Sequence, residues 1–120
     1  MRLSLISITD EHNNWLLALD EKKHLIEKSA TQLHFASERE TNIITTGSLQ
    51  SRVYSTTETI DRLWNEINDN LLDIARQAEE TDGQMTEAMV QQHEKMKTRF
   101  LSADDSLQAF CAELSNISLN

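Results

Sequence analysis

The residues of this chain that could bind a metal or act as nucleophiles are few and widely separated. Glu21 and His24 have the Glu-x-x-His spacing that supplies two ligands from one helix face in di-iron bundles. Such a site needs a second copy of the motif, which the chain lacks, and the intervening Lys22 and Lys23 favour a solvated surface. We therefore expect no metal and no cofactor. Cys111 is the single cysteine, and its apolar neighbours favour a buried, inert thiol.

Phosphotransfer is a second chemistry to consider. The run from His93 to Thr98 resembles the phosphoacceptor box of sensor kinases, and histidine phosphotransfer domains are four-helix bundles of about this length. The resemblance implies an exposed, phosphate-accepting imidazole at His93. Met96 and Lys97 stand where that family usually has lysine and glycine.

No nucleophile, base and orienting acid can be assembled from the remaining residues. We expect all four histidines on helix surfaces, where a histidine usually has no catalytic role: His12, His24, His34 and His93. With only two isolated glycines, a glycine-rich phosphate loop is excluded. We therefore expect that the protein is not an enzyme.

The composition indicates which elements must hold these residues. There is no proline among the 120 residues, so the turns that a sandwich or barrel needs every few residues are missing. The net charge of −9 argues against binding to nucleic acid or to an anionic membrane. The longest apolar run, from Trp15 to Leu19, is too short to span a bilayer. We expect one cytoplasmic, all-helical domain over 1–120.

The spacing of apolar residues predicts a first helix over 10–40, after an arm over 1–8. Thr9 or Asp10 would be its N-cap. Lys22 and Ser29 interrupt its stripe. That stripe consists of Trp15, Leu19, Ile26, Leu33 and Ala36.

A segment rich in threonine and serine follows, and it predicts a connection over 41–55 in which Gly47 has positive φ. Ser55 and Glu58 form a capping-box pattern at the start of a second helix over 56–81. The stripe of that helix is Ile60, Leu63, Ile67, Leu71, Ile74 and Ala78.

A third helix is predicted over 84–116, after a turn at Asp82-Gly83. Thr81 and Gln84 form a second capping-box pattern there, which favours a turn over one continuous rod. The fold prediction is an elongated antiparallel bundle of three long helices, about 40 Å long at 1.5 Å per residue. A long helical hairpin or coiled coil is the alternative.

The methionines of the third helix lie on one face, and methionine suits surfaces that accept a partner helix. This favours a non-enzymatic module, such as a chaperone, adaptor or assembly subunit, that binds another helical protein. The candidate contact residues are Ile67, Leu71, Met85, Met89, Met96 and Phe100. Because this stripe is wider than the first helix can cover, we also expect a homodimer with its seam near Ile67, Leu71, Met89 and Met96.

Two further functions remain open. The segment 52–82 carries eight acidic residues against three arginines, as expected of an acidic inhibitor or immunity-type protein for a basic partner. Trp64, with Phe100 and Asp104 further on, resembles the helical-hairpin substrates and chaperones of type VII secretion. That resemblance implies that Phe100 and Asp104 form the export-recognition pair, although Trp64 lacks the glycine that follows two residues later in that family.

Overall fold

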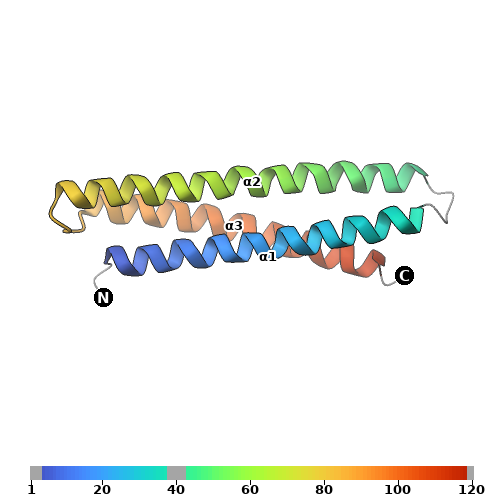
Figure 1. Ribbon diagram of the computed structural model, residues 1–120, viewed down its shortest axis with the longest axis horizontal. Helices are drawn as coiled ribbons and strands as arrows, with labels where there is room; N and C mark the ends of the chain where they lie inside the picture. Colours follow the sequence, from blue (N-terminus) through green and yellow to red (C-terminus); the bar gives the residue numbers. More distant parts are fainter. Residues whose placement is uncertain (1–3, 38–42, 119–120) are drawn as a thin grey trace.

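The chain folds as three long antiparallel helices. In the computed structural model, backbone is described for residues 4–37 and 43–118, and side chains for residues 4–32 and 49–116. The helices are α1 (Leu5–Ser37), α2 (Ile43–Glu80) and α3 (Glu87–Ser118). They run up, down and up along a rod of 62 × 22 × 16 Å (Figure 1). The predicted elongated all-α bundle is confirmed. It is longer than expected mainly because α2 has 38 residues.

The turn between α2 and α3 lies where the sequence predicts it. Asp82 and Gly83 have φ values of 54° and 84°, and the Gly83 N–H donates to the Ala78 carbonyl at 2.7 Å, which closes the end of α2. The predicted capping role of Thr81 is wrong, because its hydroxyl donates to the Gln84 carbonyl at 2.6 Å inside the turn. Thr86 is the N-cap of α3, where its hydroxyl accepts the Met89 N–H at 3.2 Å. The third helix therefore begins at Glu87 and not at residue 84.

The predicted connection over 41–55 is wrong, because α2 begins at Ile43 and includes Gly47. Just beyond this segment, hydroxyl side chains donate to carbonyls of the helix itself, as when Thr56 donates to the Arg52 carbonyl at 2.6 Å. Leu49 is buried and Val53 packs against the same core, so tertiary contacts outweigh the weak helix propensity.

The start of the first helix also differs from the prediction. Residues 5–9 are helical and not part of an arm, and the helix ends at Ser37 and not at residue 40. Ser4 is the cap: its hydroxyl accepts the Ser7 N–H at 3.2 Å, and the Ser7 hydroxyl accepts the Ser4 N–H at 3.0 Å. Thr9, one of the two expected caps, instead donates to the Leu5 carbonyl at 2.7 Å.

Buried side chains form two clusters along the axis. The larger contains Trp15, Leu19, Ile26, Leu49, Ile60, Leu63, Ile67, Met96, Phe100, Leu107, Phe110 and Leu114. The smaller, near the α2–α3 turn, contains Ile8, Ile74, Ala78 and Met89, with Leu71 partly buried against it. The predicted stripes of the first two helices are thus part of the core, except that Leu33 and Ala36 lie outside the described side chains.

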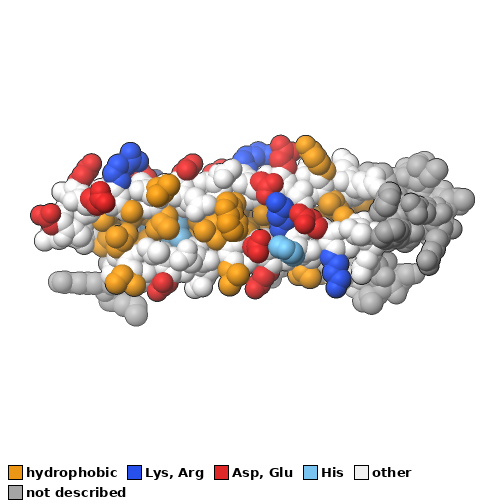
Figure 2. Space-filling model, viewed as in Figure 1, with side chains coloured by type: hydrophobic (Ala, Val, Ile, Leu, Met, Phe, Trp, Pro, Cys, Tyr) orange, Lys and Arg blue, Asp and Glu red, His pale blue; other side chains and the backbone are white. Residues whose placement is uncertain are grey.

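Charged side chains of both signs are distributed over the helices, and apolar side chains follow the seam between α1 and α2 (Figure 2). Within the described residues, no helix combines the length and apolar character needed to cross a membrane.

Candidate functional site

The stripe that the sequence offers for partner binding lies inside the bundle. Ile67 and Met89 are fully buried, and Met96 and Phe100 are almost so. Leu71 and Met85 are partly buried against the smaller cluster. These side chains contact the chain's own helices, so the expectation that they form a free surface loses its basis. The expected homodimer seam loses its basis for the same reason.

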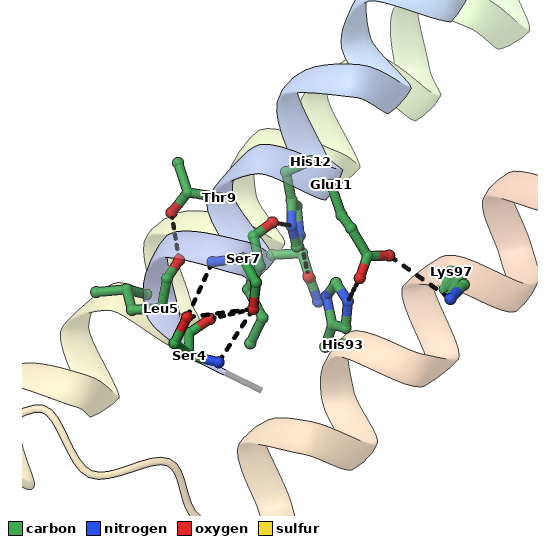
Figure 3. A network of polar contacts seen from close by, with 10 residues as sticks. Ser4, Leu5, Ser7, Thr9, Glu11, His12, His93 and Lys97 are labelled. Atoms are coloured by element: carbon green, nitrogen blue, oxygen red, sulfur yellow. Dashed lines mark hydrogen bonds and ion pairs between the residues drawn. The ribbon is translucent and has the colours of Figure 1, made fainter. Parts of the chain in front are cut away.

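A polar layer separates the two apolar clusters. It is built from His12 on α1, His93 on α3 and Asn70 on α2. Both imidazoles have no exposed surface, so the prediction that His12 and His93 lie on helix surfaces is wrong. His34 lies outside the described side chains. Figure 3 shows the two rings side by side, with Glu11 reaching toward His93.

His12 is held at both ring nitrogens. Nδ1 donates to the Ile8 carbonyl at 2.8 Å, and Nε2 lies 2.7 Å from Oδ1 of Asn70. The Asn70 amide either accepts from Nε2 or, turned by half a turn, donates to it. His12 therefore has a hydrogen-bond partner at each ring nitrogen.

His93 differs from His12 because neither of its ring nitrogens has a hydrogen-bond partner. The facing carboxylate oxygen of Glu11 lies 3.5 Å from Nε2, and the other oxygen lies 3.6 Å from Nζ of Lys97. Burial lowers the pKa of His93, and the nearby Glu11 only partly offsets this. The ring is neutral at neutral pH. A phosphate-accepting imidazole must be exposed to its donor, so the buried ring of His93 gives no support to a phosphotransfer role.

Aromatic rings close the layer on the side of the larger cluster. Trp15 stacks on His93 and, further along, on Phe100 at a centroid distance of 5.5 Å. Trp15 is therefore part of the core, and Trp64 is partly buried against the same cluster.

The pattern of Glu21 and His24 does not become a metal site. His24 is exposed, and its Nδ1 donates to the Asp20 carbonyl at 2.9 Å. The described residues contain no group of three side chains placed to hold a metal ion. Lys22 departs from the expected solvated surface, because it is largely buried in an ion pair with Asp104 of α3.

Two other residues of chemical interest are tied to the fold. Cys111 is half-buried, and burial raises the pKa of its thiol, which keeps it protonated at neutral pH. The residues that resemble an export motif are also engaged: Phe100 lies in the core and Asp104 pairs with Lys22.

A hollow of about 390 Å³ lies between α1 and α2 near Ala30 and Leu49, and a separate open groove lies between α2 and α3. Two hollows, one of about 560 Å³, share Thr59, Leu63, Ala103 and Ser106 and thus form one continuous groove. Leu63 and Ala103 form part of its floor. Small hydroxyl side chains line much of the rest: Ser55, Thr56, Thr59, Thr98, Ser102 and Ser106.

The groove has a cationic end and an apolar end. Arg62, Lys95 and Arg99 line the first, while Ile60, Leu107 and Phe110 line the second. Two of the cations already have partners: Arg99 donates to Glu66 (NH2 to Oε1, 2.8 Å), and Arg62 lies 3.9 Å from Glu58. Lys95 has no ion-pair partner among the described residues.

Sequence reasoning missed the groove and the polar layer for different reasons. The groove residues of α3 form a polar stripe with spacings of four, three and four: Lys95, Arg99, Ser102 and Ser106. The periodicity of apolar residues gives no information about such a stripe. In the layer, Asn70 and Glu11 have no distinguishing pattern, because their role depends on helices that meet only after folding.

Comparisons with models of protein families, with curated proteins and with solved structures give no match for this chain.

Proposed function

We propose that this protein is a non-enzymatic helical interaction module, of the chaperone, adaptor or assembly-subunit kind, that binds one helix of another protein in the groove between α2 and α3. The observation that carries the proposal is the groove itself. Small side chains such as Thr59, Ser102 and Ser106 line it, and they allow a fourth helix to approach the two backbones closely.

The length of the groove supports a helix as the occupant. Its α3 residues extend from Lys95 to Phe110, which is about 22 Å at 1.5 Å per residue. That length accommodates about four helical turns. An amphipathic helix laid in a groove is a common mode of recognition between proteins.

The charge of the groove defines the partner helix further. Three cations line one end of the groove although the chain carries a net charge of −9. We infer that the partner helix presents carboxylates to Lys95 and Arg62 and small apolar side chains to the partly exposed Ala103. Lys95 is the cation available for a new ion pair, because Arg99 already binds Glu66.

Site-specific photo-crosslinking in cells of the source organism tests the proposal. A photoreactive residue at Ser102 lies in the groove, whereas the same residue at Asn13 lies on an exposed face of α1. We expect Ser102 to crosslink to a helix that carries acidic residues, and Asn13 not to. Identical crosslinked products from the two positions would contradict the groove.

The crosslinked helix, made as a peptide, then allows a measurement of affinity. Lys95→Glu should raise Kd by about tenfold, equivalent to the loss of about 1.4 kcal/mol. Lys28→Glu on α1 makes the same change in net charge outside the groove and should leave Kd nearly unchanged. Equal effects of the two substitutions would mean that only net charge matters.

A further inference from the structure

The two imidazoles lie at a boundary between a large and a small part of the core. Beyond them, toward the α2–α3 turn, the buried cluster of the described residues consists of Ile8, Ile74, Ala78 and Met89, with Leu5, Leu71 and Met85 partly buried against it. At this boundary the two nitrogens of His93 are buried without hydrogen bonds, an arrangement that costs stability and is uncommon in folded proteins.

The groups that face His93 come from each of the three helices. From α1 come the Glu11 carboxylate and the His12 ring, whose centroid is 5.2 Å from that of His93. From α2 the neutral amide of Asn70 reaches the pair through His12. On α3 itself Glu94 favours a positive ring, while Lys97 competes for Glu11. Desolvation outweighs the two carboxylates.

We propose that His93 is an acid-sensitive catch: neutral, it holds the first part of α1 against α3, and when it takes a proton from solvent it releases that part of α1. The proton binds at a ring nitrogen that makes no hydrogen bond in the closed bundle. Once released, the imidazolium is hydrated, so the open form carries the charge that the closed form disfavours.

The direction of the effect follows from the pKa of the ring in each form. In the closed form burial keeps the pKa of His93 below 6.5, and in the open form it returns to that value. Above pH 6.5 both forms are neutral and the closed form is retained. As the pH falls below 6.5 the open form binds the proton more tightly, so opening becomes progressively more favourable.

The first part of α1 is the element that leaves. Gln92, next to His93, donates to Oδ2 of Asp73 at 2.7 Å and keeps α2 joined to α3 at this end. The continuous turn at Gly83 joins the same two helices. By contrast, the start of α1 is held by Ile8 and by the layer, while the larger cluster anchors α1 from Trp15 onward. A helix end with few buried contacts opens at low free-energy cost.

Release creates a new apolar surface at one end of the bundle. Ile8 on the released segment and Met89 and Ile74 on the rest of the bundle, all fully buried in the closed form, would become exposed. This surface is separate from the α2–α3 groove, so the release of α1 does not depend on the proposed function and is tested separately from it.

Native-state hydrogen exchange at pH 7.5 and pH 5.0, corrected for intrinsic exchange rates, tests the catch. In the wild type, the opening constant of amides 8–15 should be larger at pH 5.0 than at pH 7.5. The increase should be about tenfold if burial lowers the pKa of His93 by one. The opening constants of the amides around Ile67 in α2 and Met96 in α3 should be the same at the two pH values. His24→Gln, which removes an exposed histidine of α1, should behave as the wild type. His93→Phe should abolish the rise.

Two results would overturn the proposal: an undiminished rise in His93→Phe, or a rise spread evenly over all three helices. If His93→Phe does not fold, an NMR titration of the wild-type imidazoles decides the matter. The His93 ring must stay neutral in the closed protein to a pH below 6.5, and a ring that titrates above 6.5 contradicts the catch.

Discussion

The imidazole of His93 lies stacked on the indole of Trp15, with ring centroids 5.3 Å apart and an angle of 16° between the planes. The two residues come from α3 and α1, and the contact joins the polar layer to the larger apolar cluster. Trp15 is thereby an internal packing residue of the bundle and not an anchor for a partner.

The position of Trp15 leads to a prediction for stability. Trp15→Ala should lower the free energy of unfolding by about 3–5 kcal/mol, because it leaves a large cavity beside His93 and Phe100. Leu17→Ala, two residues away at a side chain that is 58% exposed, should change it by about 0.5 kcal/mol or less. Urea unfolding followed by far-UV circular dichroism measures both, and similar losses for the two variants would place Trp15 outside the core.

The ion pair between Lys22 and Asp104 should contribute more to the free energy of unfolding than the neighbouring ion pair between Lys23 and Asp61. The Lys22 and Asp104 side chains are only 14% and 16% exposed, whereas Asp61 is 59% exposed. Lys22→Ala should cost about 1.5–3 kcal/mol because Asp104 is left partly buried without its partner. Lys23→Ala should cost about 1 kcal/mol or less. A double-mutant cycle of Lys22→Ala with Asp104→Ala should show coupling, and strict additivity of the two losses would argue against the pair.

The two glycines should respond to alanine in opposite directions. Gly47→Ala should stabilise the protein by about 0.5–1 kcal/mol, because Gly47 lies within α2. Gly83→Ala should destabilise it by about 1–2 kcal/mol through its φ of 84°, even though an added Cβ would meet no neighbouring atom. The midpoint temperature of thermal unfolding shows whether each variant is more or less stable than the wild type. A loss of stability in Gly47→Ala would indicate that Gly47 lies in a non-helical connection, as the sequence predicts for 41–55.

Cys111 should react slowly with thiol reagents. Burial both shields the sulfur and raises its pKa, so little thiolate is present at pH 7.5. Alkylation by iodoacetamide should be slower by about tenfold or more in the folded protein than in urea. As a control, a cysteine at the exposed Ser106 in a Cys111→Ser background should react at nearly the same rate in both conditions. Equal rates for Cys111 in both conditions would show an accessible thiol.

Periodicity predicted the fold well where apolar residues carry the packing. The stripe from Ile60 to Ala78 and the turn at Gly83 appear as expected, because a spacing of three and four residues places those side chains on one helix face. The helix start at Ile43 could not be predicted in this way. Local propensity disfavours helix there, and Leu49 becomes buried only when α1 lies beside it.

The candidate sites were harder to predict than the fold. Histidine is as often exposed as buried, and nothing local in the sequence indicates that His12 meets His93, 81 residues away. Lys22 interrupts its stripe in sequence, yet Asp104 of α3 compensates its charge in space. The apolar stripe around Met89 and Met96 was correctly identified, but its role as a partner surface depended on how much of it the other helices cover.

The central claim is that one chain covers its own apolar stripe and leaves the α2–α3 groove for a helix of another protein. Sedimentation equilibrium of the purified protein at micromolar concentration tests this most directly. Because Ile67, Met89 and Met96 are already buried within the single chain, we predict a mass of 13.8 kDa that does not change with concentration. A mass that rises toward twice this value with concentration would mean that a second copy shares the stripe or fills the groove, and either result would contradict the account.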